Sequence, residues 1–153
     1  MSTRGLYSFT DGTPKSVCYN VYRHSDNYPT GAAEVLTDAL QYAWKEPRFE
    51  ADEFAAAFAC AGKLWSHKIA KKYGTSSGGG IRIMPHGMPQ RIAEKHCSDI
   101  AYRYAIYREK EKIMVQAFEV DIGEHYNEKW LFSCPLSEMK KVTAAIEKAN
   151  ENA

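Results

Sequence analysis

Two runs near the start of the chain alternate apolar and polar residues. Residues 5–10 and residues 17–24 both follow this pattern, and segment 11–14 between them is rich in turn-forming residues. Successive side chains of a strand point to opposite faces, so the alternation predicts a hairpin of two strands. The apolar face of the second strand, which we expect to be buried, carries Val17, Tyr19 and Val21. Its opposite face carries Cys18, Asn20, Tyr22 and His24.

Helical spacing replaces the alternation farther along. Apolar residues recur every three or four positions over residues 32–45, which predicts a helix that Pro47 ends. A second helix is expected over residues 51–74, because its first turn is acidic and its last turn is basic, in agreement with the helix dipole. Gly62 in the middle of this helix is expected to allow close packing against another element.

The second half of the chain combines a long loop with further strands. Residues 74–89 are rich in Gly and Pro, which predicts a flexible loop, within which residues 81–83 can add a short edge strand. A closing helix is expected from Pro135 onward, with an apolar stripe that ends at Ala149. Between the loop and this helix, alternation predicts an antiparallel meander of three strands at residues 100–107, 112–120 and 129–134.

The order of these elements indicates the fold class. Two strands, two helices, three strands and a helix follow one another, which favours an α+β domain with a mostly antiparallel sheet of about five strands and helices packed against it. A chain of 153 residues, of which 44% are hydrophobic, has the usual size of one domain. We therefore expect residues 1–153 to form a single domain.

Composition narrows the classes of function. The 20 Lys and Arg nearly balance the 19 Asp and Glu, so the general positive charge of a non-specific nucleic-acid-binding protein is missing. The four cysteines lie far apart, without the close pairs of a structural zinc site, and no cofactor or metal is expected. Without a signal-like or membrane-spanning run, we expect a soluble protein of the cytoplasm with reduced thiols.

The segment after the second strand holds the best candidates for a site. Tyr22 and His24 share one strand face, and Asp26 and Tyr28 follow in the turn, so an imidazole, a carboxylate and two phenols can converge. Acyl transfer would also need a nucleophile and an oxyanion site, and the sequence identifies neither, so we assign no catalytic residue and lean against an enzyme. In the structural interpretation, the same segment only turns the chain from strand to helix.

Other motifs carry less information. The run Gly78–Gly80 follows a helix and lacks the Gly-Lys-Ser/Thr ending of a phosphate loop. The remaining histidines have no spacing that pairs metal ligands. Ten tyrosines with arginines among them are typical of protein interfaces and of surfaces that stack bases, and an aromatic edge of this kind also favours a symmetric dimer.

Residues 22–33 and 98–104 carry a resemblance. They are similar to a group of small uncharacterised bacteriophage and prophage proteins with a Tyr-x-His-x-Asp-Gly-Tyr-Pro-x-Gly corner and a later acidic-x-x-Tyr-Arg-Tyr strand. Asn27 stands where the group has Gly, and Asn also tolerates left-handed dihedrals. The resemblance implies a mobile-element origin and a bacterial host cell, and it brings no established activity.

These observations lead to one main hypothesis. We expect a non-enzymatic phage or prophage accessory protein that binds a host protein or complex, such as a CRISPR effector or another defence system. The binding surface would comprise the corner at residues 22–31, the Gly-rich loop and the Tyr-Arg strand. The candidate binding residues are Tyr22, Arg23, His24, Asp26, Tyr28, Arg82 and Arg103.

Two alternatives stay open. One is a pocket that captures or hydrolyses a small phosphorylated ligand, lined by Arg23, His24, Asp26, Tyr28 and Arg103. The other is nucleic-acid binding by a local basic patch of Lys63, Lys68, Lys71, Lys72 and Arg82.

Overall fold

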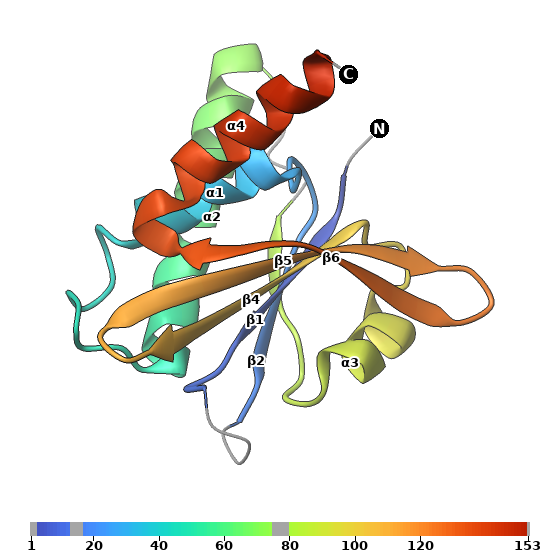
Figure 1. Cartoon of the computed structure of the whole chain (residues 1–153), viewed down its shortest axis with the longest axis horizontal. Coiled ribbons are helices and arrows are strands. Elements are labelled where there is room, and N and C mark those ends of the chain that lie inside the picture. Colours follow the sequence, from blue (N-terminus) through green and yellow to red (C-terminus); the bar gives the residue numbers. More distant parts are fainter. Residues whose placement is uncertain (1–2, 13–16, 75–79, 153) are drawn as a thin grey trace.

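A six-stranded sheet forms the centre of the protein (Figure 1). The computed structural model describes residues 3–12, 17–74 and 80–152. Along the sheet the strands lie in the order β3 (Ile81–Ile83), β2 (Tyr19–Arg23), β1 (Gly5–Phe9), β4 (Tyr102–Glu109), β5 (Lys112–Ile122) and β6 (Tyr126–Pro135).

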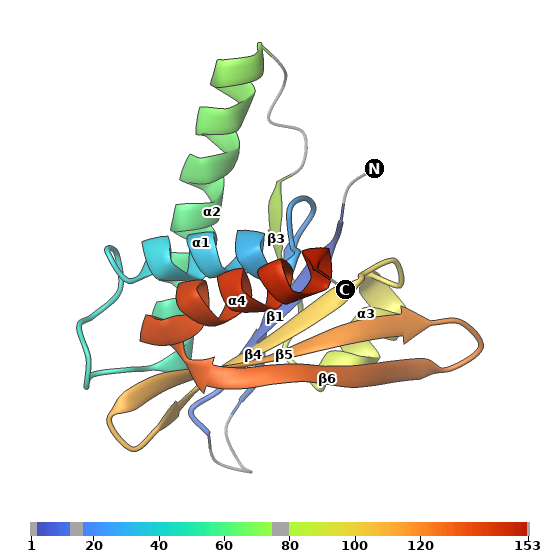
Figure 2. The same ribbon diagram turned by 45° about the horizontal axis from the view of Figure 1, so that its top comes forward.

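Helices cover both faces of this sheet. Three of them pack against one face, and the shorter α3 packs against the other (Figures 1 and 2). The helices on the first face are α1 (Pro29–Ala39), α2 (Ala51–Tyr73) and α4 (Met139–Glu151), with the single turn η1 (Leu136–Glu138) before α4. On the second face, α3 spans Pro89–His96.

The connections confirm the predicted α+β class. Neighbouring strands are antiparallel throughout except for β1 and β4, which are parallel and join the N-terminal hairpin to the meander. The edge strand at Ile81–Ile83 forms, so the sheet has six strands rather than about five.

The helix at Pro89–His96 was not expected, because Pro89 was interpreted as part of a loop although proline suits the first turn of a helix. Residues 13–14 of the predicted turn and residues 75–79 of the predicted loop lie outside the described residues.

The main core lies between the sheet and the three helices. Tyr7 and Phe9 of β1 pack against Phe58 of α2, with ring centroids 4.2 and 5.6 Å from it. A smaller core on the other face contains Leu6, Tyr22, Ile92, Ala93 and Val120. Because successive strand residues alternate between these cores, both faces of β1 and β2 are buried.

Several sequence expectations differ in detail. The strand expected from residue 100 begins only at Tyr102, and Ile100 lies before it in the smaller core. Helix α1 ends at Ala39, earlier than expected, and tighter turn bonds continue the chain to Tyr42. Two residues assigned to buried faces, Val17 and Ala149, are exposed.

Helix α2 agrees closely with its sequence. It runs from Ala51 to Tyr73, and Gly74 ends it with a left-handed φ of 64°. A Cβ on Gly62 would lie 2.1 Å from Cδ1 of Ile81, so the expected close packing is confirmed. Within the described residues, none of the helices is long and apolar enough to cross a membrane.

Candidate functional site

The corner between β2 and α1 is built around the buried side chain of Asn27. Its Oδ1 accepts a hydrogen bond from the Tyr7 hydroxyl at 2.7 Å. Its Nδ2 donates to the carbonyl oxygens of Thr3, Arg23 and Ser25, at 2.8, 2.8 and 3.1 Å. The Tyr104 hydroxyl donates to the backbone oxygen of Asn27 at 2.6 Å. We call Tyr7, Arg23, Asn27 and Tyr104 the Asn27 network.

Arg23 belongs to this network and not to the surface. Only 2% of the residue is exposed, and its guanidinium lies 4.8 Å from the ring centroid of Trp65. Its Nη1 donates to the backbone oxygen of Asp26 at 3.1 Å and contacts Oδ1 of Asn27 at 3.5 Å. Burial raises the pKa of Tyr7 to about 12 although the Arg23 charge opposes this, so the phenol stays a neutral donor at ordinary pH. The network therefore holds the corner in shape.

The turn itself depends on Asp26 and Gly31. Asp26 has a left-handed φ of 58°, so the strained dihedral lies one residue before Asn27, which does not use the left-handed tolerance that the sequence suggested. A Cβ on Gly31 would lie 2.2 Å from the backbone oxygen of Asp26. Only glycine allows the first turn of α1 to approach the corner this closely.

Tyr22 and His24 lie apart from Arg23, toward the face that α3 covers. The Tyr22 hydroxyl and Nδ1 of His24 are 2.9 Å apart. Nearby, Arg4 and Asp99 form an ion pair, with Nε of Arg4 3.0 Å from Oδ2 of Asp99. The Cys97 thiol lies on the same side of the sheet, and burial raises its pKa to about 11. That thiol is protonated at neutral pH and is a poor nucleophile.

The two other candidate arginines do not meet the corner. Arg82 is paired in register with Tyr22 and is exposed. Arg103 lies on β4, with Leu6 of β1 between it and Tyr22 across the sheet. Its Nε and Nη2 donate to the two oxygens of Glu128 at 2.6 and 3.0 Å, and its guanidinium lies 4.6 Å from the ring centroid of Phe118. Arg103 is thus occupied by its own ion pair.

The Arg103–Glu128 pair gives a prediction for pH dependence. Burial raises the pKa of Glu128, but hydrogen bonds from Arg103 and Tyr126 outweigh this and hold it below its usual value. A lowered pKa contributes stability above the unfolded-state value, and this contribution is lost as the pH falls through the folded-state value. We expect Glu128→Gln to lower the free energy of unfolding by about 1–2 kcal/mol at neutral pH.

Urea unfolding at a series of pH values tests this expectation. The difference between the wild type and Glu128→Gln should shrink as the pH falls below about 4. Glu111→Gln, at an exposed position in the β4–β5 turn, is the matched control and should change stability little at any pH. A Glu128→Gln difference that is constant across this range would contradict the assignment.

Two adjoining hollows lie on the other side of the corner. The larger, about 780 Å³, lies between α4 and strands β4–β6, and the smaller, about 450 Å³, lies between α4 and the start of α1. Both are lined by Tyr28, Thr30 and Thr143. We call the joined hollow the Tyr28 groove, after the corner residue that lines both hollows and is 55% exposed.

The groove has an apolar floor and a mainly acidic rim. Tyr28 and Tyr102 form the floor with their ring centroids 5.9 Å apart, together with Leu131 and Ile146. Burial raises the pKa of Tyr102, with further contributions from Glu119 and Tyr28, so its phenol stays neutral. The charged residues in the lining are five carboxylates and two lysines, at Asp26, Glu34, Glu119, Glu147, Glu151, Lys129 and Lys140.

Comparisons with protein-family models, with curated proteins and with solved structures each returned no match. The site must therefore be interpreted from its own geometry.

The seven candidate residues thus fall into separate places. Asp26 and Tyr28 line the Tyr28 groove, whereas Tyr22 and His24 contact each other on the opposite face. Arg23 is buried, Arg103 is paired with Glu128, and Arg82 is exposed on the edge strand β3. Among the described residues, no three His, Cys, Asp or Glu side chains gather into a group that would hold a metal ion.

Proposed function

We propose that the protein is a non-enzymatic binding protein that captures a basic, partly apolar segment of a partner protein in the Tyr28 groove. The observation that carries the proposal is the half-exposed aromatic floor of Tyr28 and Tyr102 beneath a mainly acidic rim. Exposed tyrosines supply large contact area and are enriched among the residues that dominate binding energy. The acidic rim selects a cationic partner.

The charges on α4 support the same proposal. Glu147 and Glu151 lie four residues apart near the C-terminal end of the helix, where both line the groove. Like charges at this spacing repel, and carboxylates oppose the negative end of the helix dipole, each at a cost of a few tenths of a kcal/mol. Lys or Arg side chains of a bound segment would relieve this repulsion.

The source of the partner rests on the resemblance to phage and prophage proteins. A protein of that origin acts inside a bacterial host, so we propose a host protein as the partner, with a defence complex such as a CRISPR effector as the first class to test. The groove chemistry supports the binding mode, and the resemblance alone supports this choice of partner.

A small phosphorylated ligand fits the geometry less well. The arginines expected to bind its phosphate were Arg23, which is buried, and Arg103, which is paired with Glu128. The hollow beside the corner contains more carboxylates than lysines, and this would repel a phosphate.

Affinity capture with groove variants tests the proposal. Tagged wild-type protein is incubated with lysate of the bacterial host, and the retained protein is purified so that its Kd can be measured. We expect Tyr28→Ala, and separately Glu147→Lys with Glu151→Lys, to weaken its binding at least about tenfold. Matched controls are Tyr42→Ala, whose side chain is similarly exposed at 47%, and Glu109→Lys with Glu111→Lys, which are exposed at the other end of the sheet.

The control variants should bind within about twofold of the wild type. Equal loss in groove and control variants, or a partner whose contacting segment is acidic, would contradict the proposal.

A further inference from the structure

One stretch of forty residues carries positive charge and no carboxylate. Residues 54–93 contain no Asp or Glu, and their six cations are Lys63, Lys68, Lys71, Lys72, Arg82 and Arg91. The other 113 residues contain the remaining 14 cations and all 19 carboxylates, so their net charge is −5. The net charge of +1 therefore conceals two regions of opposite sign.

The fold sets the second half of α2 apart from the body of the protein. After Gly62, Ala70 is the one buried residue in the described length of α2. The last eleven residues of the helix extend about 16 Å at the usual rise per residue. Figure 2 shows this end of α2 projecting beyond α1 and α4. All four lysines of α2 lie in this part and are exposed.

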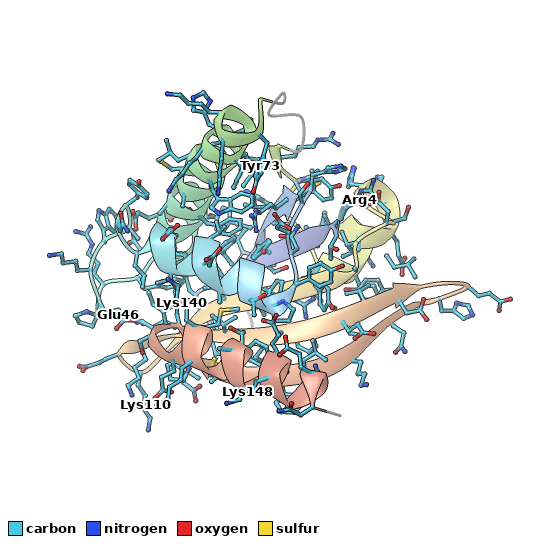
Figure 3. The ribbon with its side chains drawn as sticks, turned by 90° about the horizontal axis from the view of Figure 1, so that it is seen from above. Arg4, Glu46, Tyr73, Lys110, Lys140 and Lys148 are labelled. Carbon is cyan, nitrogen blue, oxygen red and sulfur yellow. The ribbon has the colours of Figure 1, made fainter. Side chains whose placement is uncertain are left out.

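The lysines at the end of α2 are separate from the lining of the Tyr28 groove. Trp65 of α2 lines the smaller hollow, whereas none of the four lysines lines either hollow. Figure 3 shows Tyr73 at the end of α2 far from Lys148 of α4. Substitutions of these lysines therefore leave the groove lining unchanged.

We propose that this surface, comprising Lys63, Lys68, Lys71 and Lys72 of α2, binds the phosphate backbone of a nucleic acid. Lysines that neutralise phosphates release condensed counterions, which supplies most of the free energy of non-specific nucleic-acid binding. No neighbouring carboxylate in the sequence competes for them, and neither of the two ion pairs found within residues 3–12, 17–74 and 80–152 involves any of the four. Their charge is therefore available to a polyanion.

The helical positions agree with contact along a backbone. Lys68 and Lys72 are one turn apart, and Lys71 lies beside them. Tyr73, 65% exposed at the end of the helix, offers a ring on which an unpaired base can stack. Favourable contact with the helix dipole accounts for lysines in the last turn, but it falls off within that turn and does not account for Lys63 or Lys68.

Fluorescence anisotropy with labelled nucleic acids tests the proposal. The probes are single-stranded DNA, single-stranded RNA and duplex DNA, each of about 20 nucleotides or base pairs, titrated between about 50 and 300 mM salt. With about four phosphates contacted, the slope of log Kobs against log salt is expected to be roughly −3 to −4. The triple variant Lys68→Gln, Lys71→Gln, Lys72→Gln should weaken binding at least about tenfold at low salt and reduce the slope by about 2.

The control carries the same change in net charge elsewhere. Lys112→Gln, Lys141→Gln and Lys148→Gln are exposed positions outside the basic surface, and this triple variant should retain affinity within about threefold. Tyr28→Ala should leave nucleic-acid binding unchanged, so failure of the groove proposal and failure of this one can be told apart.

Three results would overturn the proposal. The first is no detectable nucleic-acid binding at low salt, and the second is an equal loss of affinity in both triple variants. The third is tighter binding of poly-glutamate than of any nucleic acid, because that result would identify an acidic protein as the partner.

Discussion

Replacing Asn27 with alanine is expected to lower the free energy of unfolding by about 3–4 kcal/mol, a large part of the stability of an ordinary domain. The side chain is fully buried and bonds to four partners, the Tyr7 hydroxyl and three backbone carbonyls. Alanine would remove all four of these bonds from a place that excludes water, beside the buried guanidinium of Arg23, although the Thr3 carbonyl would keep the backbone N–H of position 27 as a donor. Urea unfolding followed by circular dichroism measures the loss.

Two further variants separate this network from general effects of substitution. Tyr7→Phe removes one hydroxyl and should cost only about 1 kcal/mol, because Arg23 still contacts Oδ1 of Asn27. Asn127→Ala, at an exposed position on β6, should change stability by less than about 0.5 kcal/mol. An Asn27→Ala protein as stable as Asn127→Ala would show that the Asn27 network does not hold the corner.

Gly31→Ala is expected to destabilise the protein by about 2–4 kcal/mol, although alanine is normally the better helix residue by about 1 kcal/mol. Its new Cβ would lie 2.2 Å from the backbone oxygen of Asp26 and 3.1 Å from the carbonyl carbon. This backbone cannot yield freely, because the same oxygen accepts the hydrogen bond from Nη1 of Arg23. Thermal and urea unfolding of the variant measure the cost.

Gly62→Ala is the matched comparison, because its Cβ would also meet an atom at close range. That atom is Cδ1 of Ile81, the end of a side chain that can adopt another rotamer, and the site lies in the interior of α2. Helix propensity and the clash then nearly cancel, and the net change should stay within about 1 kcal/mol. If Gly62→Ala proved as damaging as Gly31→Ala, contact with backbone would not be the deciding factor.

Local patterns predicted the elements that form from local contacts. The hairpin of β1 and β2, helix α2 with its glycine end, and the meander of β4 to β6 all follow from alternation, spacing and helix-end signals. The parallel pairing of β1 with β4 has no local signal, because about a hundred residues separate the strands. Helix α3 was missed because a helix of eight residues, next to two prolines and a glycine, is short enough to be mistaken for a loop.

The site was predicted in part. The sequence identified the corner, and it included Tyr28, which does line a groove, but it expected only one face of β2 to be buried, whereas both are. It gave no sign that Arg23 would be buried, because its contact with Trp65 spans 42 positions. Asn27 was interpreted through its dihedral preference, whereas its role comes from hydrogen bonds to residues as distant as Tyr104.

Local sequence patterns do not predict the groove. Its lining comes from the corner, from helices α1, α2 and α4 and from three strands, which only the complete fold brings together. The sequence did offer a local basic patch as an alternative, but the nearly balanced composition gave no sign of an acidic groove. In the structure, the buried side chains of Arg23 and Asn27 support the exposed surface at Tyr28.

Site-specific photo-crosslinking on β6 tests the groove most directly. Leu131 lines the Tyr28 groove, and the neighbouring Trp130 pairs with Phe118 and is exposed outside it. A photoreactive residue is placed at each position in turn and irradiated in the presence of the host partner. We expect a crosslink from position 131, within a segment of the partner that contains Lys or Arg, and little or none from position 130. Efficient crosslinking from position 130 with none from position 131 would contradict binding in the groove.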